Sequence, residues 1–370
     1  MISLFTVGKE KTLMQTHSVY FCNYSIGTDV YGQVAETCRI YGRKALLIGG
    51  KLALEAGEAR LRAALEGSDL EIADVALFGH ECTYARMDEL AALAKKLDVD
   101  MIFGMGGGKA LDTAQGTAQK AGLPVFTFPT IAATCAATTA LSVVYREDSS
   151  FENFYFYPRP PYHAFIDLSI IAQAPDRYLQ AGMGDTIGKY FECHVAARGD
   201  TLAHDSALGR EISNMCYAPL LEHGVQALQD CRSGIASHAL KQAVLANIVS
   251  TGLVSLMVLD EYNCAIAHSV YYALVLLPGF EQAQLHGNVV AYGVLVQLLV
   301  DGEIEEARRL KAFLQQLDIR TTLAEMDVRL DRDYLKAVLH EAVTGPDMEH
   351  IPYPVSEDMI WEAFCAVEAL

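Results

Sequence analysis

Short apolar runs alternate with amphipathic segments along the first part of the chain. The runs have the length of buried strands, and the segments between them repeat apolar residues at helical spacing. The predicted strands are residues 44–48, 72–78, 99–103, 125–128 and 164–166. The predicted helices between them are residues 52–66, 87–97 and 110–121. Strands that alternate with helices predict a parallel sheet with right-handed crossovers.

The pattern changes after residue 140. Residues 141–145 and 151–157 flank a polar turn and predict a hairpin. Beyond residue 169 the spacing of apolar residues is mainly helical. We therefore predict two domains, an α/β domain over residues 1–165 and an all-α domain over residues 166–370.

Composition narrows the classes of function. A chain of 370 residues with a formal net charge of −18 has room for two cores and lacks the basic face that nucleic acid needs. Nine cysteines without a C-x-x-C pair indicate reduced thiols. Neither a signal peptide nor an apolar run of membrane-spanning length is visible. The expectation is a cytoplasmic protein with no membrane or nucleic-acid partner.

The stretch Gly104-Met-Gly-Gly-Gly-Lys-Ala-Leu-Asp112 follows one predicted strand and opens a helix. Glycines admit a bulky ligand close to the backbone, and a helix start offers free N–H groups to a phosphate. A second glycine pair, Gly49-Gly50, also follows a strand. The spacing G-x-G-G-G-K differs from the G-x-G-x-x-G pattern of dinucleotide sites, so a simple tight turn remains the alternative.

Three polar residues stand out in the apolar second half: Asp185, His268 and His286. Taken singly, they are typical of a helix cap, a core histidine and a residue at a helix start. Together, a carboxylate and two imidazoles suit Zn²⁺ or Fe²⁺ and leave one coordination position for substrate. The sequence does not show whether the three converge.

The order and spacing of these motifs resemble the iron-containing, or group III, alcohol dehydrogenase superfamily. The stretches that carry the likeness are the glycine motif, Pro129-Thr-Ile-Ala-Ala-Thr-Cys135, Ala181-Gly-Met-Gly-Asp185, Ala265-Ile-Ala-His268 and His286-Gly-Asn-Val-Val-Ala-Tyr-Gly293. Within this superfamily the chain resembles the glycerol dehydrogenase branch. The Thr-Ile-Ala-Ala-Thr-Cys form is most similar to the hydroxycarboxylate dehydrogenase A subgroup, which reduces 2-oxo acids with NADPH.

The resemblance implies a Rossmann-like domain, an all-helical domain and a cleft between them, as in the dehydroquinate synthase-like fold. It implies one divalent metal on Asp185, His268 and His286, with Zn²⁺ or Fe²⁺ first and Ni²⁺ or Mn²⁺ as further candidates. It implies a homo-oligomer and a nicotinamide cofactor, NADP(H) or NAD(H). The residues it assigns to the cofactor are Gly106, Gly107, Gly108, Lys109 and Asp112 at the pyrophosphate, and Thr130, Ala133, Thr139, Leu141 and Tyr145 beside the nicotinamide.

Two departures from the family pattern concern the substrate. Glycerol dehydrogenases have an aspartate where this chain has Cys135, and a thiol is a poor substitute in polyol binding. The family's second histidine, four residues after the first histidine ligand, is Tyr272 here. Its phenol is a candidate for substrate binding or proton relay, and an ordinary core tyrosine is the alternative. We take Cys135 and Tyr272 as candidate catalytic residues.

A third departure concerns the cofactor. NAD-preferring members carry an acidic residue after the second strand, where this chain has Gly50 followed by Lys51. Loss of the carboxylate removes repulsion against a 2′-phosphate, and Lys51 can pair with it. This predicts a preference for NADPH; if Lys51 only starts a helix, NADH stays open.

The sequence thus predicts a metal-dependent oxidoreductase that interconverts a small 2-oxo acid and its 2-hydroxy acid. The substrate carboxylate needs a cationic partner, for which Lys189 and Arg177 are candidates. The alternatives are an NAD-dependent glycerol or polyol dehydrogenase, a lyase on the dehydroquinate synthase scaffold, and a non-catalytic nucleotide-binding homologue.

Overall fold

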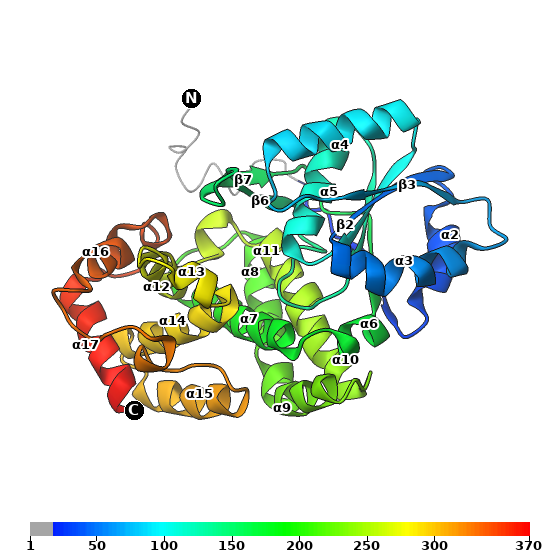
Figure 1. Cartoon of the computed structure of the whole chain (residues 1–370). Coiled ribbons are helices and arrows are strands. Elements are labelled where there is room, and N and C mark those ends of the chain that lie inside the picture. Colours follow the sequence, from blue (N-terminus) through cyan, green and yellow to red (C-terminus); the bar gives the residue numbers. More distant parts are fainter. Residues whose placement is uncertain (1–17) are drawn as a thin grey trace.

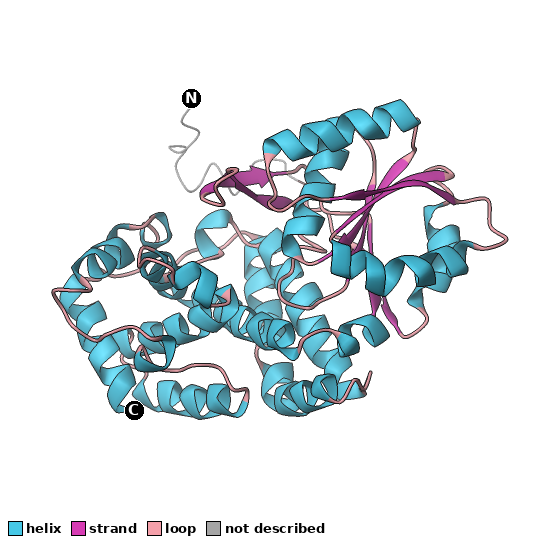
Figure 2. Ribbon diagram, viewed as in Figure 1, coloured by secondary structure: helices cyan, strands magenta, loops and turns pink. Residues whose placement is uncertain are grey.

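The computed structural model describes residues 18–370, with a sheet-bearing amino-terminal part and a helical carboxy-terminal part (Figures 1 and 2). Within the described residues, six parallel strands form the main sheet in the order β1-β8-β5-β4-β2-β3. These strands are β1 (Asn23–Gly27), β2 (Lys44–Gly49), β3 (Glu71–Leu77), β4 (Met101–Gly106), β5 (Val125–Pro129) and β8 (His163–Asp167). Two antiparallel strands, β6 (Leu141–Tyr145) and β7 (Phe151–Phe156), form the predicted hairpin.

Helices cover both faces of the main sheet, as in other parallel sheets. The helices of this part are α2 (Val34–Cys38), α3 (Lys51–Leu65), α4 (Tyr84–Leu97) and α5 (Gly108–Ala121). Along β2, Leu47 packs with Leu61 of α3, whereas Leu46 and Ile48 pack with Leu90 of α4 on the other face. The five strands predicted from the sequence are therefore present. The sequence also suggested a first strand around residues 19–21; the structure places it a few residues later, at β1, where two residues are exposed and three are half-buried.

The carboxyl ends of β2 and β4 meet where the order of strands reverses. From β2 the chain passes through α3 to β3 on one side, and from β3 through α4 to β4 on the other side. The loops after these two strands touch, because a Cβ on Gly106 would lie 3.9 Å from the Gly50 nitrogen. Ligands of open α/β sheets bind in the crevice at such a switch point.

Beyond β8 the described chain is helical. Its helices are α6 (Leu168–Gln173), α7 (Asp176–Ala196), α8 (His204–Ile212), α9 (Ala218–Arg232), α10 (His238–Val244), α11 (Thr251–Met257), α12 (Ile266–Val275), α13 (Phe280–Ala283), α14 (His286–Val300), α15 (Ile304–Gln316), α16 (Lys336–Thr344) and α17 (Glu357–Ala369). A π-helical turn, Leu245–Ser250, joins α10 to α11. Short 3₁₀ turns lie at Val30–Gln33, Ser213–Cys216, Asp260–Tyr262, Ala324–Met326 and Pro346–Met348.

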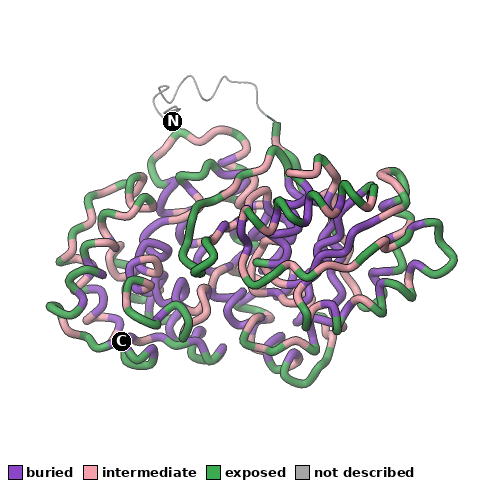
Figure 3. Tube along the Cα trace, turned by 45° about the horizontal axis from the view of Figure 1, so that its top comes forward, coloured by how far each residue is buried: buried purple, intermediate pink, exposed green. Residues whose placement is uncertain are grey.

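Helices α7 and α14 form the centre of this part, and α12 packs beside them. Figure 3 shows buried segments running through the interior of both parts, with exposed positions along the outer helices. Nearly every residue of α14 is buried, so His286 at its first position stands at the edge of a packed core.

One helical run of the described chain, His238–Met257, is long and apolar enough to span a membrane by length and composition alone. The sequence showed no uninterrupted apolar run of this length, because polar residues such as Lys241, Gln242 and Asn247 lie within the segment. Of its most apolar window, 61% is buried inside the protein, as in a core helix. All nine cysteines lie in the described part, and no disulfide joins any two of them there.

Candidate active site

Close packing of α7 on α14 brings two of the predicted metal ligands together. A Cβ on Gly184 would lie 2.3 Å from the Gly287 carbonyl oxygen, and one on Gly287 would lie 1.8 Å from the Ala181 carbonyl oxygen. Backbone therefore rests on backbone at this crossing, which only glycine permits. Asp185 and His286 are the residues adjacent to these glycines, so the contact sets their separation.

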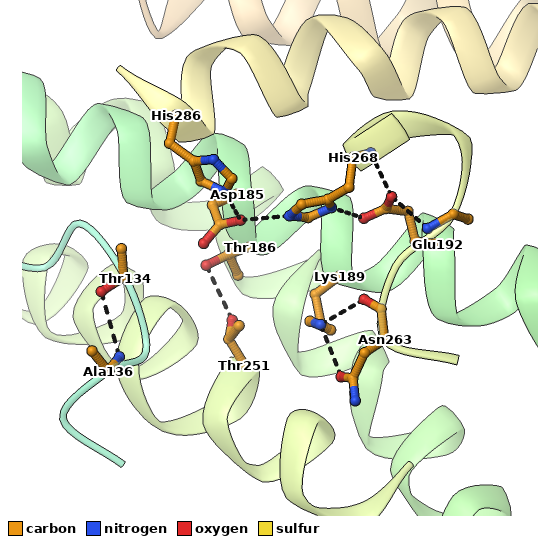
Figure 4. Close-up of polar contacts among 11 residues, drawn as sticks. Thr134, Ala136, Asp185, Thr186, Lys189, Glu192, Thr251, Asn263, His268 and His286 are labelled. Carbon is orange, nitrogen blue, oxygen red and sulfur yellow. Dashed lines mark hydrogen bonds and ion pairs between the residues drawn. The ribbon is translucent and has the colours of Figure 1, made fainter. Parts of the chain in front are cut away.

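The third predicted ligand, His268, comes from the first turn of α12. Nε2 of His286 lies 3.4 Å from Oδ1 of Asp185, and Nε2 of His268 lies 3.7 Å from the same oxygen. The three ligand atoms all lie within 4.8 Å of one another. Figure 4 shows the Asp185 carboxylate between the two imidazoles. The structure thus brings together three residues that are far apart in the sequence.

Glu192 orients His268 and was not identified from the sequence. Its Oε2 lies 2.6 Å from Nδ1 of His268, and its Oε1 accepts from the backbone N–H groups of Ala265 and His268. A carboxylate on Nδ1 fixes the tautomer and directs Nε2 towards a metal. The sequence held one signal of this role, since Glu192 follows Asp185 by seven residues, or two helical turns, in an otherwise apolar segment.

The chemistry of these donors fits a divalent ion of the zinc and iron type. Burial alone would raise the pKa of Asp185, but the hydrogen bond and charge of His286 hold it below its ordinary value. The His286 side chain is 36% exposed, against 8% for His268, so the cluster opens towards His286. Three protein donors with one open side are the arrangement of catalytic rather than structural metal sites.

Lys189 lies on the same face of α7, one turn after Asp185. Its Nζ donates to the backbone oxygen of Asn263 at 2.7 Å and to Oδ1 of the same residue at 3.0 Å (Figure 4). Burial would lower the pKa of Lys189, but the groups around it, chiefly Cys264 and Cys135 and then two carboxylates, raise it. The result is a buried cation beside the ligand cluster.

Arg177, the other predicted partner for a substrate carboxylate, lies elsewhere. It is exposed in the first turn of α7, and its guanidinium bonds to the Tyr178 hydroxyl at 3.3 Å. Two full turns of α7 separate it from Asp185. Of the two candidates, only Lys189 reaches the cluster.

The glycine motif forms a cradle at the start of α5. Gly107 precedes the helix without a capping side chain, and Gly106 has φ +150°, a conformation that favours glycine. A Cβ on Gly107 would lie 2.5 Å from the Ile131 side chain, and one on Gly108 would lie 3.4 Å from Oγ1 of Thr134. A helix start with free N–H groups and no Cβ in front of it fits a pyrophosphate.

Two polar residues predicted for the cofactor face the hairpin instead. Lys109 pairs with Glu81 at 2.6 Å and lies 4.8 Å from the centre of the Tyr145 ring. Asp112 is buried and accepts from the Val143 backbone N–H at 3.1 Å. Burial raises the pKa of Asp112 to about 8. Both residues therefore connect α5 to the hairpin, on which Leu141 and Tyr145 lie.

The remaining predicted cofactor residues lie at the ends of strands. Gly50 precedes α3, and Lys51 is its exposed first residue, with no ion pair among the described residues. After β5, the backbone N–H of Thr130 donates to the Gly106 oxygen at 3.1 Å, so this loop lies against the cradle. The loop also carries Ala133 and Thr139, and the Thr139 hydroxyl lies 3.4 Å from the Cys135 oxygen.

Cys135 and Tyr272 come from different elements, the loop after β5 and helix α12. Burial raises the pKa of Cys135 to about 12, and the charges of Asp185 and Lys189 also act on this thiol. The Tyr272 ring centre lies 6.4 Å from that of His268. Its neighbour Tyr271, which the sequence did not single out, packs edge-on against His286 with ring centres 4.3 Å apart.

A second group of donors in the described chain, Asp200, Glu261 and His350, also lies within 4.8 Å. Here Nε2 of His350 contacts Asp200 at 2.7 Å, whereas Nδ1 is the nitrogen that faces Glu261 at 3.9 Å. Opposite nitrogens of one ring cannot serve the same ion. The closest contacts of this group thus use both nitrogens of His350, whereas in the first cluster each histidine presents Nε2 to the same Asp185 oxygen.

Fold and site together define the class of protein. A parallel sheet with a glycine cradle at its switch point, joined to a helical part with a three-residue metal-type cluster, defines a two-part protein with a nucleotide-type and a metal-type site. Comparison with known proteins agrees with this class. The family model described as iron-containing alcohol dehydrogenase matches residues 23–168.

Curated relatives extend the match to most of the chain. Hydroxycarboxylate dehydrogenase A of Escherichia coli strain K12 is 33% identical over 329 residues, 88% of this chain and 90% of that protein. Glycerol dehydrogenase of Escherichia coli O6:H1 is 29% identical over 352 residues, 93% and 94% of the two chains. The crystal structure of a probable glycerol dehydrogenase from Sinorhizobium meliloti 1021 has a TM-score of 0.83 and 25% identity, covering 96% and 99%.

The chain belongs to the iron-containing alcohol dehydrogenase family. It is an NAD(P)-dependent dehydrogenase that acts on CH–OH groups, and its family uses a divalent metal. The α/β and all-α parts predicted from the sequence are the fold of this family.

Proposed function

We propose that the enzyme interconverts a small 2-oxo acid and its 2-hydroxy acid with NADPH and one divalent metal. The observation that carries the proposal is the buried ammonium of Lys189 beside the ligand cluster. An ammonium has three N–H donors, and Asn263 accepts two of them. No third acceptor contacts Lys189 among the described residues. A substrate carboxylate accepts the third hydrogen bond of this ammonium, and its negative charge balances the buried positive charge.

Cys135 supports the same substrate class. A polyol site needs acceptors for hydroxyl protons, whereas the Cys135 thiol, with a pKa raised to about 12 by burial, is neutral and a weak acceptor. Burial also raises the pKa of Tyr272, so its phenol stays protonated at neutral pH. In this proposal Tyr272 is a hydrogen-bond donor to the substrate oxygen, and Cys135 lines the pocket.

The metal and the cofactor supply the chemistry of the reaction, and the chain's residues hold and orient the reactants. When bound, a divalent ion supplies Lewis acidity at the substrate oxygen, and the nicotinamide supplies the hydride. Asp185, His268 and His286 hold the ion. Lys189 orients the substrate by its carboxylate.

The cofactor preference rests on the end of β2. Gly50 and Lys51 leave no carboxylate at the first residues of α3, and Lys51 is exposed and unpaired among the described residues. The cradle Gly106–Gly108, one strand away, would hold the cofactor's phosphates. In this proposal residues 1–165 form the cofactor domain and residues 166–370 the metal and substrate domain. Assembly as a homo-oligomer in the cytoplasm belongs to the same proposal.

Paired substrates test the proposal. Metal-reconstituted enzyme is assayed with NADPH and NADH against 2-oxobutyrate and dihydroxyacetone. We expect Lys189→Met to raise the KM for 2-oxobutyrate by roughly 100-fold, the loss of a charged hydrogen bond, and not to impair reduction of dihydroxyacetone. Lys311→Met is the matched control, because Lys311 is also buried but donates to the Val367 oxygen far from the site. Equal losses on both substrates would exclude Lys189 as the carboxylate partner.

A charge reversal tests the cofactor preference. Lys51→Glu should raise the KM for NADPH and leave that for NADH nearly unchanged, because only NADPH carries the 2′-phosphate. Lys96→Glu, on the exposed face of α4, controls for the change in overall charge. An unchanged KM for NADPH would place the 2′-phosphate elsewhere.

Glycerol oxidation is the second candidate. It is favoured by the relatives and the solved structure named as glycerol dehydrogenases. Turnover of dihydroxyacetone with NADH, without turnover of 2-oxobutyrate, would establish it. No turnover of either substrate, with intact cofactor binding, would exclude both candidates and point to another small carbonyl compound as the substrate.

A further inference from the structure

The loop that follows β5 is held between the two parts of the molecule. On one side it meets the glycine cradle, where Thr134 and Ile131 would contact a Cβ on Gly108 or Gly107. On the other side it meets α7 and the π turn Leu245–Ser250. The loop also carries Cys135, whose pKa is influenced by the charges of Asp185 and Lys189. It therefore lies between the cofactor cradle and the ligand cluster.

Asn247, in the π turn, bridges the loop to the metal-ligand helix. Its Nδ2 donates to the Ala132 oxygen at 2.9 Å and lies 3.3 Å from the Leu179 oxygen of α7. A Cβ on Gly182 would lie 1.9 Å from the Ala132 oxygen. The loop backbone thus rests directly on α7, one turn before Asp185.

Thr138 makes the second contact between the loop and the π turn. Its hydroxyl lies 2.6 Å from the Ile248 backbone oxygen, and it is 4% exposed. A π turn interrupts the regular ladder of a helix and leaves a carbonyl available to an outside donor. A Cβ on Gly252 would lie 2.1 Å from this hydroxyl, so the helix has no side chain where Thr138 sits.

Helix α11, which continues the π turn, reaches the ligand cluster through its first residue, Thr251. The Thr251 hydroxyl bonds to the Ala246 oxygen at 3.0 Å, across the turn, and to the Thr186 hydroxyl at 3.1 Å. Thr186 follows Asp185 in α7. Figure 4 shows the Thr186–Thr251 contact beneath the Asp185 carboxylate. The π turn thus contacts the loop, and the helix that continues it contacts the residue next to the candidate ligand Asp185.

We infer that the π turn Leu245–Ser250 sets the distance between the cofactor's reactive ring and the metal ligands, with Thr138 and Asn247 as positioning residues. The inference rests on the proposed site for cofactor and metal, but not on the identity of the substrate. Hydride transfer is sensitive to displacements of about 1 Å, which can cost 100-fold in rate. A loop tied to the π turn by the side chains of Thr138 and Asn247, the second of which also contacts α7, holds that distance when substrate enters.

Thr138→Val, which removes the hydroxyl at nearly constant volume, is the principal test. With whichever carbonyl compound the enzyme reduces, we expect kcat to fall about tenfold or more, as for a misplaced reactant. The KM for that compound and the Kd for the nicotinamide cofactor should change little. The primary deuterium isotope effect from 4-deuterated cofactor should rise, because hydride transfer becomes slower than product release. Thr138→Ser should restore all of these values.

Thr117→Val is the matched control. Thr117 is fully buried in α5, and its hydroxyl has no hydrogen-bond partner among the described residues. Unchanged kcat and isotope effect in Thr138→Val would overturn the inference. So would a parallel loss of kcat, cofactor affinity and melting temperature that serine does not rescue, since that indicates a purely structural role.

Hydrogen exchange gives a readout that needs no turnover. In the full chain, the amides of residues 130–139 should exchange faster in Thr138→Val than in wild type, with those of β4 unchanged. If Thr138→Val does not fold, hydrogen exchange of the wild-type protein in denaturant tests the inference instead. Residues 130–139 and 245–250 should then become exposed together as denaturant is added, and separate opening of the two segments would overturn the inference.

Discussion

At the scale of single residues, Glu192 determines which nitrogen of His268 faces the ligand cluster. It is fully buried, and three donors, the imidazole Nδ1 and two backbone N–H groups, meet its two oxygens. A buried carboxylate is stable only with such partners. It also makes the imidazole a better ligand, because its negative charge increases the basicity of Nε2.

Glu192→Gln should therefore weaken metal binding without removing a ligand. We expect the affinity for Zn²⁺ to fall about 10- to 100-fold, the usual effect of losing such a partner. Competition with a chromophoric chelator measures it. Asp176→Asn is the control, because Asp176 also lies on α7 and the change breaks only an exposed ion pair, with Arg232 of α9. Equal affinities for the Glu192→Gln and wild-type proteins would contradict the assigned role.

Asp112 shows the cost of burying a carboxylate with few partners. Burial raises its pKa to about 8, and the Val143 N–H only partly opposes this. An ordinary aspartate in the unfolded chain has a pKa of about 3.9. The folded state therefore binds a proton more tightly than the unfolded state, and this contribution to stability is present below about pH 4 and lost by about pH 8.

Asp112→Asn should remove this pH dependence, because the amide does not titrate. We expect the difference in unfolding free energy, variant minus wild type, to rise with pH by at most about 1.4 kcal/mol per unit between pH 4 and 8. Denaturant melts of the cofactor-free protein across this range measure the difference. Asp74→Asn, on the exposed face of β3, should show no such trend. A constant difference would mean that Asp112 ionises normally.

At the scale of elements, α7 organises the site. Asp185, Lys189 and Glu192 recur at helical spacing along one face, so one helix supplies a metal ligand, a cation and the partner of a second ligand. Its glycines allow α14 to approach to backbone contact. The position of His286 is thus set by helix packing, and the imidazole's own contacts only refine it.

Gly287→Ala tests this link between packing and the site. The added Cβ would meet the Ala181 carbonyl oxygen at 1.8 Å, and backbone cannot move aside as a flexible side chain can. We expect a loss of about 1–3 kcal/mol in stability, as for other overpacked cores, together with weaker metal binding. Gly27→Ala, where no atom lies within 4 Å, should change neither property. If Gly287→Ala is less stable but binds metal with normal affinity, the packing of α14 on α7 does not determine the geometry of the metal site.

At the scale of the whole molecule, the three ligands join three helices of one core. Asp185, His268 and His286 come from α7, α12 and α14, which pack on one another. The unfolded chain holds these residues far apart, so a metal binds the folded state preferentially. Binding should therefore stabilise the entire helical part rather than a single loop.

Metal should raise the melting temperature of the wild-type protein. At a free concentration 100 times the Kd, the gain is about 2.7 kcal/mol. Thermal melts with Zn²⁺ and with EDTA measure the gain. Asp185→Ala should melt at the same temperature in both solutions. A metal-dependent rise that persists in this variant would mean that the stabilising ion binds somewhere else.

The local chemistry of the sequence determined much of the fold. Apolar runs of strand length, separated by helical segments, gave the parallel sheet and its order of elements, because strand and helix periods differ and are visible in the residues themselves. The glycines after β2 and β4 marked the ends of these two strands, and so the switch point, because they too can be read directly from the sequence. The candidate ligands Asp185, His268 and His286 were visible as polar residues in apolar helices.

Tertiary structure alone decided which of these residues meet. Glu192 and Tyr271 join the ligand cluster through contacts between helices; helical spacing places Glu192 on the same face as Asp185 but does not reveal its contact with His268. Lys189 reaches the site and Arg177 does not, although both lie on α7, because a helix buries one face and exposes the other. Asp112 turned out to hold the hairpin, since its partner Val143 lies on a separate strand. Sequence patterns report local periods, whereas these contacts depend on how distant segments pack.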